Sequence, residues 1–366
     1  METLDQERAD AFAGRLITML DDASLALLTS VGHRTGLFDA LAGLGPASSP
    51  EIARAAALDE RYVREWLGGM VVGGIVEYDP AARTYLLPPE HAAFTTEVAG
   101  PDNLAFFTQY VSLMGAIEPE IVRVFRQGGG VPYSAYPTFQ QLQRDETARV
   151  YDAALVDVIL GLVPGLVQQL ESGIDVVDVG TGGGHAVNVM ARAFPRSRFL
   201  GIDISEEGIE IGRTEAAGWG LSNATFEVTD AAALTGRYDL VTAFDTVHDQ
   251  AEPTKLLSSI SDALSDDGVF LMGDVAFSSD LEDNIGNPMA PTVFAFSVFH
   301  CMTVSLAYGG EGLGTAWGEQ AARAKLADAG FDDVETAQVE GDPLNIYYIA
   351  RKTGGEQPGT AGQDLI

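Results

Sequence analysis

A chain of 366 residues, 46% of them hydrophobic, can bury a sizeable core and is expected to hold two domains. Its 53 acidic residues against 21 basic ones give a formal net charge of −32 at pH 7. This charge argues against nucleic acid and anionic membranes as partners, because their phosphates would be repelled over most of the surface.

The lysine and cysteine content indicates the environment in which the protein is expected to work. Only three basic residues are lysines, and an acidic, lysine-poor chain suits a salt-rich cytoplasm, where screening shortens from about 8 Å to about 3 Å at 1 M salt. We therefore expect a halophilic source, the alternative being an acidic mesophilic protein. The single cysteine, Cys301, excludes an internal disulfide and a cysteine-cluster metal site, so no metal is expected. The charged N-terminus METLDQERADAF differs from a signal peptide, which predicts a cytoplasmic protein.

The first hundred residues have the pattern of a winged helix. Helical spacing predicts helices over 6–29 and 37–44, followed by one that Ser48 or Ser49 caps, with Pro50 as its first residue. The amphipathic stretch ERYVREWLGGMVVGG predicts a further helix, and IVEYDPAARTYLL predicts a hairpin.

The rest of the chain is first helical and then alternates between strands and helices. A Gly-, Pro- and Tyr-rich loop, QGGGVPYSAYPTF, interrupts the helical part. From Ile174 onward the alternation predicts a doubly wound, seven-stranded α/β sheet. The predicted strands are IDVVDVG, RFLGIDIS, ATFEVTD, YDLVTAFDTV, GVFLMGDVAF, VETAQVE and NIYYIARK. The predicted divisions are a winged-helix domain 1–100, a helical linker and substrate cap 101–170, an α/β domain 171–352 with an insert at 279–313, and a disordered tail 353–366.

One uncharged segment is long enough to cross a bilayer. No charged residue occurs between Asp283 and Glu311. Pro288, Pro291 and several polar residues interrupt the segment, which lies inside the α/β pattern. We therefore interpret it as a buried helical insert over a substrate pocket, and expect no membrane partner.

The stretch DVGTGGG places four glycines between the first predicted strand and a helix. Glycines there let the backbone turn sharply and approach a ligand, and the helix start offers free N–H groups to an anion. A dinucleotide pattern, G-x-G-x-x-G, would need a third glycine where the chain has His185. The pattern D-x-G-x-G-x-G is complete, through Asp178, Gly180, Gly182 and Gly184. It resembles the first motif of the class I S-adenosylmethionine methyltransferases.

Two further acids follow the next strands. Asp203 ends the second strand and Asp230 follows the third, so both are expected on one rim with Asp178 at the carboxyl edge of the sheet. The resemblance implies that Asp203 accepts the ribose hydroxyls and that Asp230 lies near the adenine amino group. The alternative for each acid is a helix cap or a solvated loop end. The implied S-adenosyl-L-methionine site comprises Asp178, Gly180, Thr181, Gly182, Gly184, Asp203, Ile204, Asp230, Ala231, Phe244 and Asp245.

The two closing strands extend the resemblance. NIYYIARK follows VETAQVE after a short turn and fits the antiparallel seventh strand that is typical of this superfamily. The resemblance therefore covers about 174–352 and implies a Rossmann-like methyltransferase sheet.

The N-terminal part resembles the winged-helix module of small-molecule O-methyltransferases, which in that family mediates dimerisation and covers the substrate. DNA binding is the rival function. Residues 1–100 hold 15 acidic and 7 basic residues, and the helix that would enter a groove is too apolar to be exposed. These features favour a buried homodimer interface.

The stretch FDTVHDQAEP resembles the L-H-D-W stretch of the same O-methyltransferases, with Gln250 in place of the usual tryptophan. The resemblance implies that His248 is the general base for a substrate hydroxyl and that the neighbouring Asp249 orients it. The alternative is a histidine and an aspartate that simply start the next helix. With the loop GGGVPYSAYP, the uncharged segment resembles an actinobacterial and archaeal set of winged-helix methyltransferases. Candidates for the pocket wall, with plain packing as the alternative, are Tyr133, Tyr136, Phe296, His300 and Trp317.

Together these features predict a cytoplasmic, homodimeric S-adenosylmethionine-dependent methyltransferase with a small-molecule acceptor, for which a hydroxyl is expected. The alternative function is a winged-helix regulator that kept the cofactor fold to sense the cofactor.

Overall fold

The computed structural model describes residues 4–339 and 342–352. The tail 353–366, expected to be disordered, lies outside the described residues. The chain divides into two compact units, Met1–Ala116 and Ile117–Ile366, which are described separately below.

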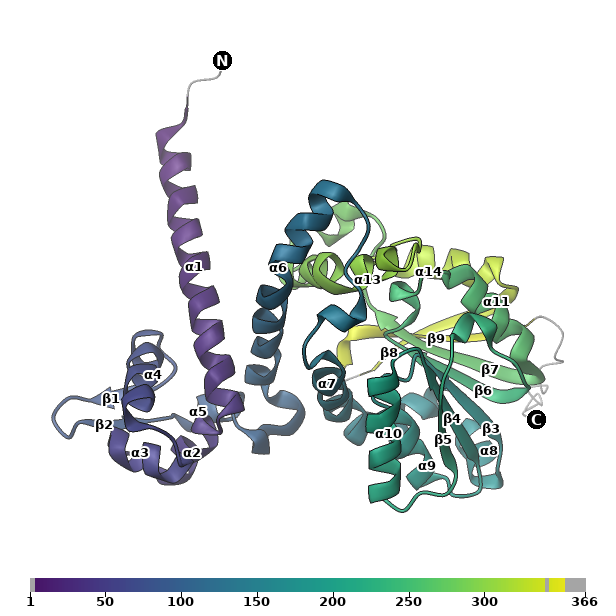
Figure 1. Ribbon diagram of the computed structural model, residues 1–366, viewed down its shortest axis with the longest axis horizontal. Coiled ribbons are helices and arrows are strands. Elements are labelled where there is room, and N and C mark those ends of the chain that lie inside the picture. Colours follow the sequence, from purple (N-terminus) through teal and green to yellow (C-terminus); the bar gives the residue numbers. More distant parts are fainter. Residues whose placement is uncertain (1–3, 340–341, 353–366) are drawn as a thin grey trace, which may run out of the picture. The chain divides into compact units, whose positions relative to one another are not determined.

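The first unit is the predicted winged helix (Figure 1). The tryptophan of its fourth helix ties that helix to the first, because Trp66 Nε1 donates a hydrogen bond to the carbonyl of Leu28 at 2.7 Å. The first helix continues past its expected end at Thr29, and Pro50 is the second residue of its helix because that helix begins at Ser49. The elements are α1 (Gln6–Arg34), α2 (Leu37–Leu44), α3 (Ser49–Ala56), α4 (Glu60–Val72), β1 (Glu77–Asp79), β2 (Thr84–Leu86) and α5 (Pro89–Ala92).

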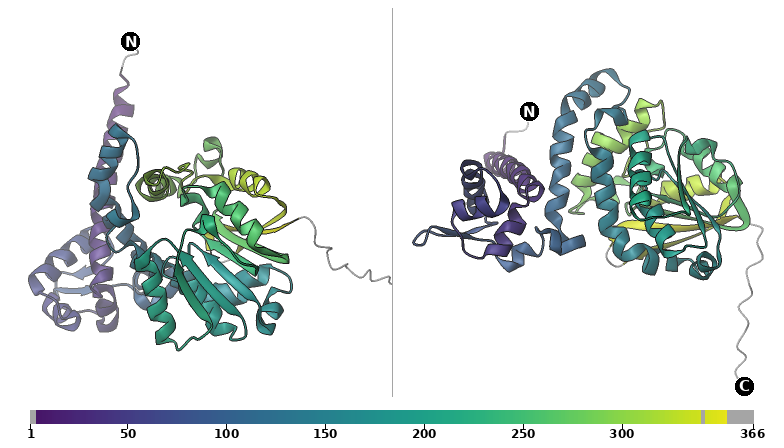
Figure 2. Two further views of the ribbon diagram at one scale, coloured as in Figure 1. Left: turned by 45° about the vertical axis from the view of Figure 1, so that its right-hand side comes forward. Right: turned by 60° about the horizontal axis from the view of Figure 1, so that its bottom comes forward.

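The second unit is built on one seven-stranded sheet (Figures 1 and 2). Its strand order is β5-β4-β3-β6-β7-β9-β8; β9 is antiparallel to both neighbours, and the strands from β5 to β7 pair in parallel. The doubly wound sheet and its antiparallel closing strand are thus confirmed. The strands are β3 (Asp175–Val179), β4 (Arg198–Asp203), β5 (Ala224–Val228), β6 (Tyr238–Phe244), β7 (Leu264–Val275), β8 (Phe331–Val339) and β9 (Asp342–Lys352).

Helices cover both faces of this sheet. The helix α6 (Gln109–Gln127) begins in the first unit and ends in the second. The other main helices of the second unit are α7 (Phe139–Ala154), α8 (Leu166–Ser172), α9 (His185–Ala193), α10 (Glu206–Gly218), α11 (Pro253–Ala263) and α14 (Gly318–Asp328).

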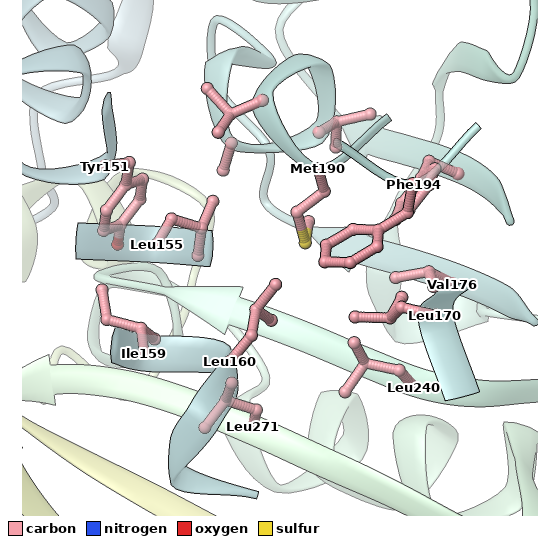
Figure 3. Packing of buried hydrophobic residues seen from close by; sticks show 14 of the residues in the cluster. Tyr151, Leu155, Ile159, Leu160, Leu170, Val176, Met190, Phe194, Leu240 and Leu271 are labelled. Atoms are coloured by element: carbon pink, nitrogen blue, oxygen red, sulfur yellow. The ribbon is translucent and has the colours of Figure 1, made fainter. Parts of the chain in front are cut away.

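The core of the second unit has two layers because successive strand residues point to opposite faces. Val176 and Leu240 pack in one layer with Met190 of α9 (Figure 3). Their neighbours Val177 and Val241 pack in the other layer, against α11 and α14. Burial on both faces explains why these strands are continuous apolar runs.

The uncharged segment forms a broken helix on the second unit. It comprises α12 (Ala290–Phe296), a π-helical turn (Ser297–Cys301) and α13 (Met302–Ala307). The 18 residues Ala290–Ala307 are long and apolar enough to span a membrane, and 44% of them are buried within the structure. The segment is bonded to the Gly-, Pro- and Tyr-rich loop: Val131 N–H donates to the Thr303 carbonyl at 3.1 Å, and Tyr136 donates to the Phe299 carbonyl at 2.7 Å. A Cβ added to Gly130 would lie 1.9 Å from the Thr303 carbonyl oxygen, so the two segments are in direct backbone contact.

Candidate active site

The glycine loop leaves the carboxyl end of β3 and leads into α9. Gly180, Gly182 and Gly184 have φ values of 67°, 50° and 69°, a region that favours glycine. A Cβ on Gly180 would meet Thr246 at 2.0 Å, and one on Gly184 would meet the Phe226 ring at 2.4 Å. A Cβ on Gly182 would have no described atom nearer than Oε1 of Gln140, at 3.8 Å, so the side of Gly182 where a side chain would lie is open.

The three predicted acids lie in different surroundings. Asp178 is 4% exposed inside β3, where Thr242 Oγ1 donates to it at 2.6 Å and burial raises its pKa to about 6. Asp203 ends β4 and accepts hydrogen bonds from the Gly182 and Ser205 N–H groups at 2.9 and 2.7 Å. Asp230 is exposed and caps the turn Ala231–Ala233. The expected rim therefore consists of Asp203 and Asp230, with Asp178 buried rather than on the surface of the edge.

The remaining predicted cofactor residues lie in the loop or at the carboxyl ends of the neighbouring strands. Thr181 N–H donates to the Ile202 carbonyl at 3.0 Å, which joins the loop to β4. Ile204 is 48% exposed after Asp203, whereas Ala231 is buried. Phe244, the last residue of β6, lies with its ring centroid 5.1 Å from that of Tyr151.

Asp245 is strained and only half satisfied. Its φ of 52° is unusual for a residue with a side chain. Asn345 donates to Oδ2 at 3.2 Å, while the buried Oδ1 has no hydrogen-bond partner among the described residues. Burial, together with the neighbouring Asp274, raises its pKa well above the ordinary value. An acceptor of this kind suits a ligand that brings a donor group, such as an ammonium.

The candidate base, His248, is buried and paired with a carboxylate. Its Nδ1 lies 2.8 Å from Oδ1 of Asp274, and Trp317 Nε1 donates to the same oxygen at 3.0 Å. Asp249 does not orient the histidine, because it accepts a hydrogen bond from the Tyr133 hydroxyl instead. The prediction that Asp249 orients His248 is therefore wrong. Asp274 was missed, although a carboxylate at the end of the apolar strand GVFLMGDVAF was a usable signal.

The pairing changes the acidity of His248. Burial lowers its pKa, but the charge and hydrogen bond of Asp274, together with the neighbouring Cys301, outweigh burial and raise the pKa well above 6.5. His248 is therefore protonated over a wider pH range than a free imidazole is. His300, buried without such a partner and close to the His248 charge, has its pKa lowered to about 3.

Three of the five predicted pocket residues come together. Tyr133, Tyr136 and His300 surround Phe139, whose ring stacks on His300 with centroids 4.0 Å apart. Phe139 was not predicted. Trp317 lies beside Asp274 instead. Phe296 ends α12 and is half-buried.

Comparison with known proteins agrees with this geometry. Residues 23–97 match the model of the Rv2258c-like winged HTH domain, and residues 170–303 match that of a methyltransferase domain. A ubiquinone biosynthesis O-methyltransferase from Leptothrix cholodnii is 31% identical over 104 residues, 27% of this chain and 43% of that protein. This chain spans only 62% and 43% of the lengths of two curated relatives that it matches.

Solved structures match over nearly the whole chain. An O-methyltransferase family protein from Burkholderia thailandensis superposes with a TM-score of 0.69 at 14% identity, over 94% of this chain and 99% of that one. Human N-acetylserotonin methyltransferase, solved with S-adenosylmethionine, gives a TM-score of 0.67 at 16% identity, over 96% and 99% of the two chains.

The fold of the second unit, with the glycine loop at the carboxyl edge of its sheet, is the class I methyltransferase fold. More particularly, the chain joins a winged helix-turn-helix domain to a methyltransferase domain, and O-methyltransferases are among its structural neighbours.

Proposed function

We propose that this chain is an S-adenosylmethionine-dependent methyltransferase that transfers a methyl group to a hydroxyl of a small molecule. One observation carries the proposal: a glycine loop with a carboxylate on the next strand and a buried His–Asp pair are held at the carboxyl ends of neighbouring strands of a methyltransferase sheet. Ligands bind at that edge in open α/β sheets.

The residues at the edge fit the cofactor. Asp203 would accept hydrogen bonds from the ribose hydroxyls, and Asp230 and Ala231 would lie beside the adenine. Oδ1 of Asp245, which has no hydrogen-bond partner within the described part of the chain, would accept a hydrogen bond from the ammonium. The room around Gly182 lets the backbone approach the amino-acid part. When bound, the cofactor supplies an electrophilic methyl on a positively charged sulfur.

This chain's own residues position the acceptor and move one proton. His248, in its neutral form, takes the proton from the acceptor hydroxyl at Nε2, while Asp274 holds Nδ1 and fixes the ring. Alignment of the oxygen with the methyl supplies most of the rate. We assign the acceptor site to the aromatic cluster of Tyr133, Tyr136 and His300, under a cap formed by residues 117–170 of the second unit and the insert.

The test is transfer of a labelled methyl group. Purified protein in high salt is offered phenolic, carboxylic and amine acceptors with radiolabelled cofactor, and calorimetry measures binding of S-adenosylmethionine and its demethylated product. We expect both to bind and a hydroxyl compound to become labelled. Tight NADH binding with no binding of either sulfur compound contradicts the proposal.

We further propose that the winged helix pairs two copies. Residues 10–24 of α1 are all exposed. Helices are stabilised mainly by packing of one face, so a helix with no packed face is unusual. Side chains at alternating intervals of four and three residues form a seam along α1, here called the α1 seam: Ala13, Ile17, Leu20, Ser24, Leu27 and Val31. This 3.5-residue spacing is the spacing of a coiled coil. Ile17 and Leu20 are each 70% exposed, so the seam is open to a partner.

The α1 seam is complementary to itself in the antiparallel direction. In that register Ile17 lies opposite Leu27 of the second copy, and Asp10 lies opposite Arg34, which pairs unlike charges.

On α4, Arg61 and Arg64 are paired with glutamates, which leaves little free positive charge for DNA. Sequence-selective DNA binding below micromolar concentration would favour the regulator instead. We also propose a cytoplasmic location and a halophilic source, supported by the charge of −32.

A further inference from the structure

Three helices meet at one buried carboxylate next to the glycine loop. Glu215, on α10, has a side chain that is 8% exposed. Its Oε2 accepts from Nδ1 of His185 at 2.9 Å and from Nδ2 of Asn188 at 3.0 Å, both on α9. Its Oε1 accepts from the guanidinium of Arg144, on α7. One side chain therefore joins three segments that are distant in the sequence.

These contacts keep Glu215 ionised. Burial alone would raise its pKa, but the hydrogen bonds from His185, Arg144 and Asn188 outweigh burial and lower the pKa to about 2. Removing one partner from a buried charge leaves the rest uncompensated, which is strongly unfavourable. The carboxylate of Glu215 therefore stays charged and bonded to both α7 and α9.

The cluster ties the first half of α7 to the glycine loop. A Cβ on Gly183 would lie 2.7 Å from Cβ of Arg144, and one on Gly182 would lie 3.8 Å from Oε1 of Gln140. Gln140 is 8% exposed. The first two turns of α7 thus lie directly on the loop that the proposed cofactor must reach.

The two halves of α7 are held in different ways. In the second half, Tyr151 packs in the hydrophobic core beside Leu155, which follows α7. The first half is held to α10 by the Arg144–Glu215 pair, and it also packs through Phe139, which stacks on His300, and through the buried Leu142. It follows a loop in which Gly128 and Gly129 have positive φ. Asp152, in the second half, adds a bond to Nε2 of His185 at 3.2 Å.

We propose that Glu215 is a latch that holds the first half of α7 over the glycine loop and sets the rate at which cofactor enters and leaves. The proposal rests on the proposed function in one respect, that the loop binds S-adenosylmethionine. Glu215 touches no reacting atom in this scheme, so it is a positioning residue. Its loss changes exchange of the cofactor more than the chemistry of transfer.

The test compares two changes on the same helix. Glu215→Gln removes the charge of the latch, whereas Glu210→Gln removes an exposed carboxylate that pairs with Arg213 on α10. A hydrogen bond to a charged group contributes about 1.5–3 kcal/mol, so we expect the demethylated cofactor to dissociate about 10- to 100-fold faster from Glu215→Gln. The rate for Glu210→Gln should stay within about twofold of the unmodified protein. Stopped-flow displacement by labelled cofactor measures both rates.

Hydrogen exchange separates the latch from general weakening and from failure of the proposed function. In Glu215→Gln, exchange should rise in 139–147 and stay unchanged in β3 and β6. Dissociation at the unmodified rate, or exchange that rises throughout the sheet, overturns the latch. If Glu215→Gln does not fold, Arg144→Gln tests the same contact from α7, at a side chain that is 27% exposed. If the unmodified protein binds no cofactor, the proposed function fails, and exchange in 139–147 still decides whether the latch exists.

Discussion

At the scale of single residues, the acidity of His248 sets the pH at which the proposed base works. A base must be neutral to accept a proton, and Asp274 holds the pKa of His248 well above 6.5 despite burial. Transfer to a hydroxyl should therefore rise with pH, with an apparent pKa above 6.5 in kcat/KM. Asp274→Asn removes the charge that raises the pKa, so the profile should move to lower pH while the maximal rate falls. Rates measured over pH 5–10 test both expectations.

The matching test of the base is His248→Ala. General base catalysis contributes about 10²- to 10⁴-fold, and turnover should fall by that factor with little change in cofactor affinity. Raising the pH toward the pKa of the acceptor should restore part of the rate. Near-normal turnover from pH 6 to 9 would remove His248 from catalysis.

In the proposed site Asp203 accepts hydrogen bonds both from the ribose hydroxyls and from the Gly182 N–H, and two substitutions test its contribution. Asp203→Ala should weaken binding of S-adenosylmethionine by about tenfold or more, because it removes the ribose acceptor and the acceptor of the Gly182 N–H. Asp203→Asn keeps one acceptor oxygen and should weaken binding less. Calorimetry on both variants gives the comparison. Equal affinity of Asp203→Ala and the unmodified protein would exclude Asp203 from the site.

At the scale of elements, the α1 seam predicts a specific crosslink. In a Cys301→Ser background, copies that carry Ile17→Cys are mixed with copies that carry Leu27→Cys and are then oxidised. The antiparallel register should give a disulfide-linked dimer in the mixture and little in either variant alone. A parallel register would give the dimer with Ile17→Cys alone. The absence of any dimer by light scattering would contradict pairing through α1.

The elements themselves could be predicted because their signals are local. Apolar runs predicted the strands, and DVGTGGG predicted the turn into α9. The partner of His248 could not be predicted in the same way. It lies 26 positions further on, and the pairing of β6 with β7, which sets Phe244 against Gly273, brings it close. The end of α1 had a local signal that was not used: the helix ends at Arg34, and Thr35 is followed by Gly36, whose φ is 69°.

At the scale of the whole molecule, the net charge predicts how stability depends on salt. With a charge of −32, the compact state repels itself more than the expanded chain does, and added salt screens that repulsion. The Tm should therefore rise from low salt to molar KCl, as calorimetry in matched buffers would show. A Tm that stays flat or falls over that range would contradict the halophilic source.

The backbone contact between Gly130 and the insert limits how this molecule can be rebuilt. Replacing residues 279–313 with the matching segment of a protein of the same fold, in order to change the proposed acceptor, would also replace the Thr303 carbonyl that accepts from the Val131 N–H. It would change the surface against which Gly130 packs, where a Cβ has no space. The loop that contains Gly130 and the insert are far apart in the sequence, but they would have to be exchanged together. Chimeras that carry both stretches from the same donor should fold, whereas those that mix donors should lose the fit.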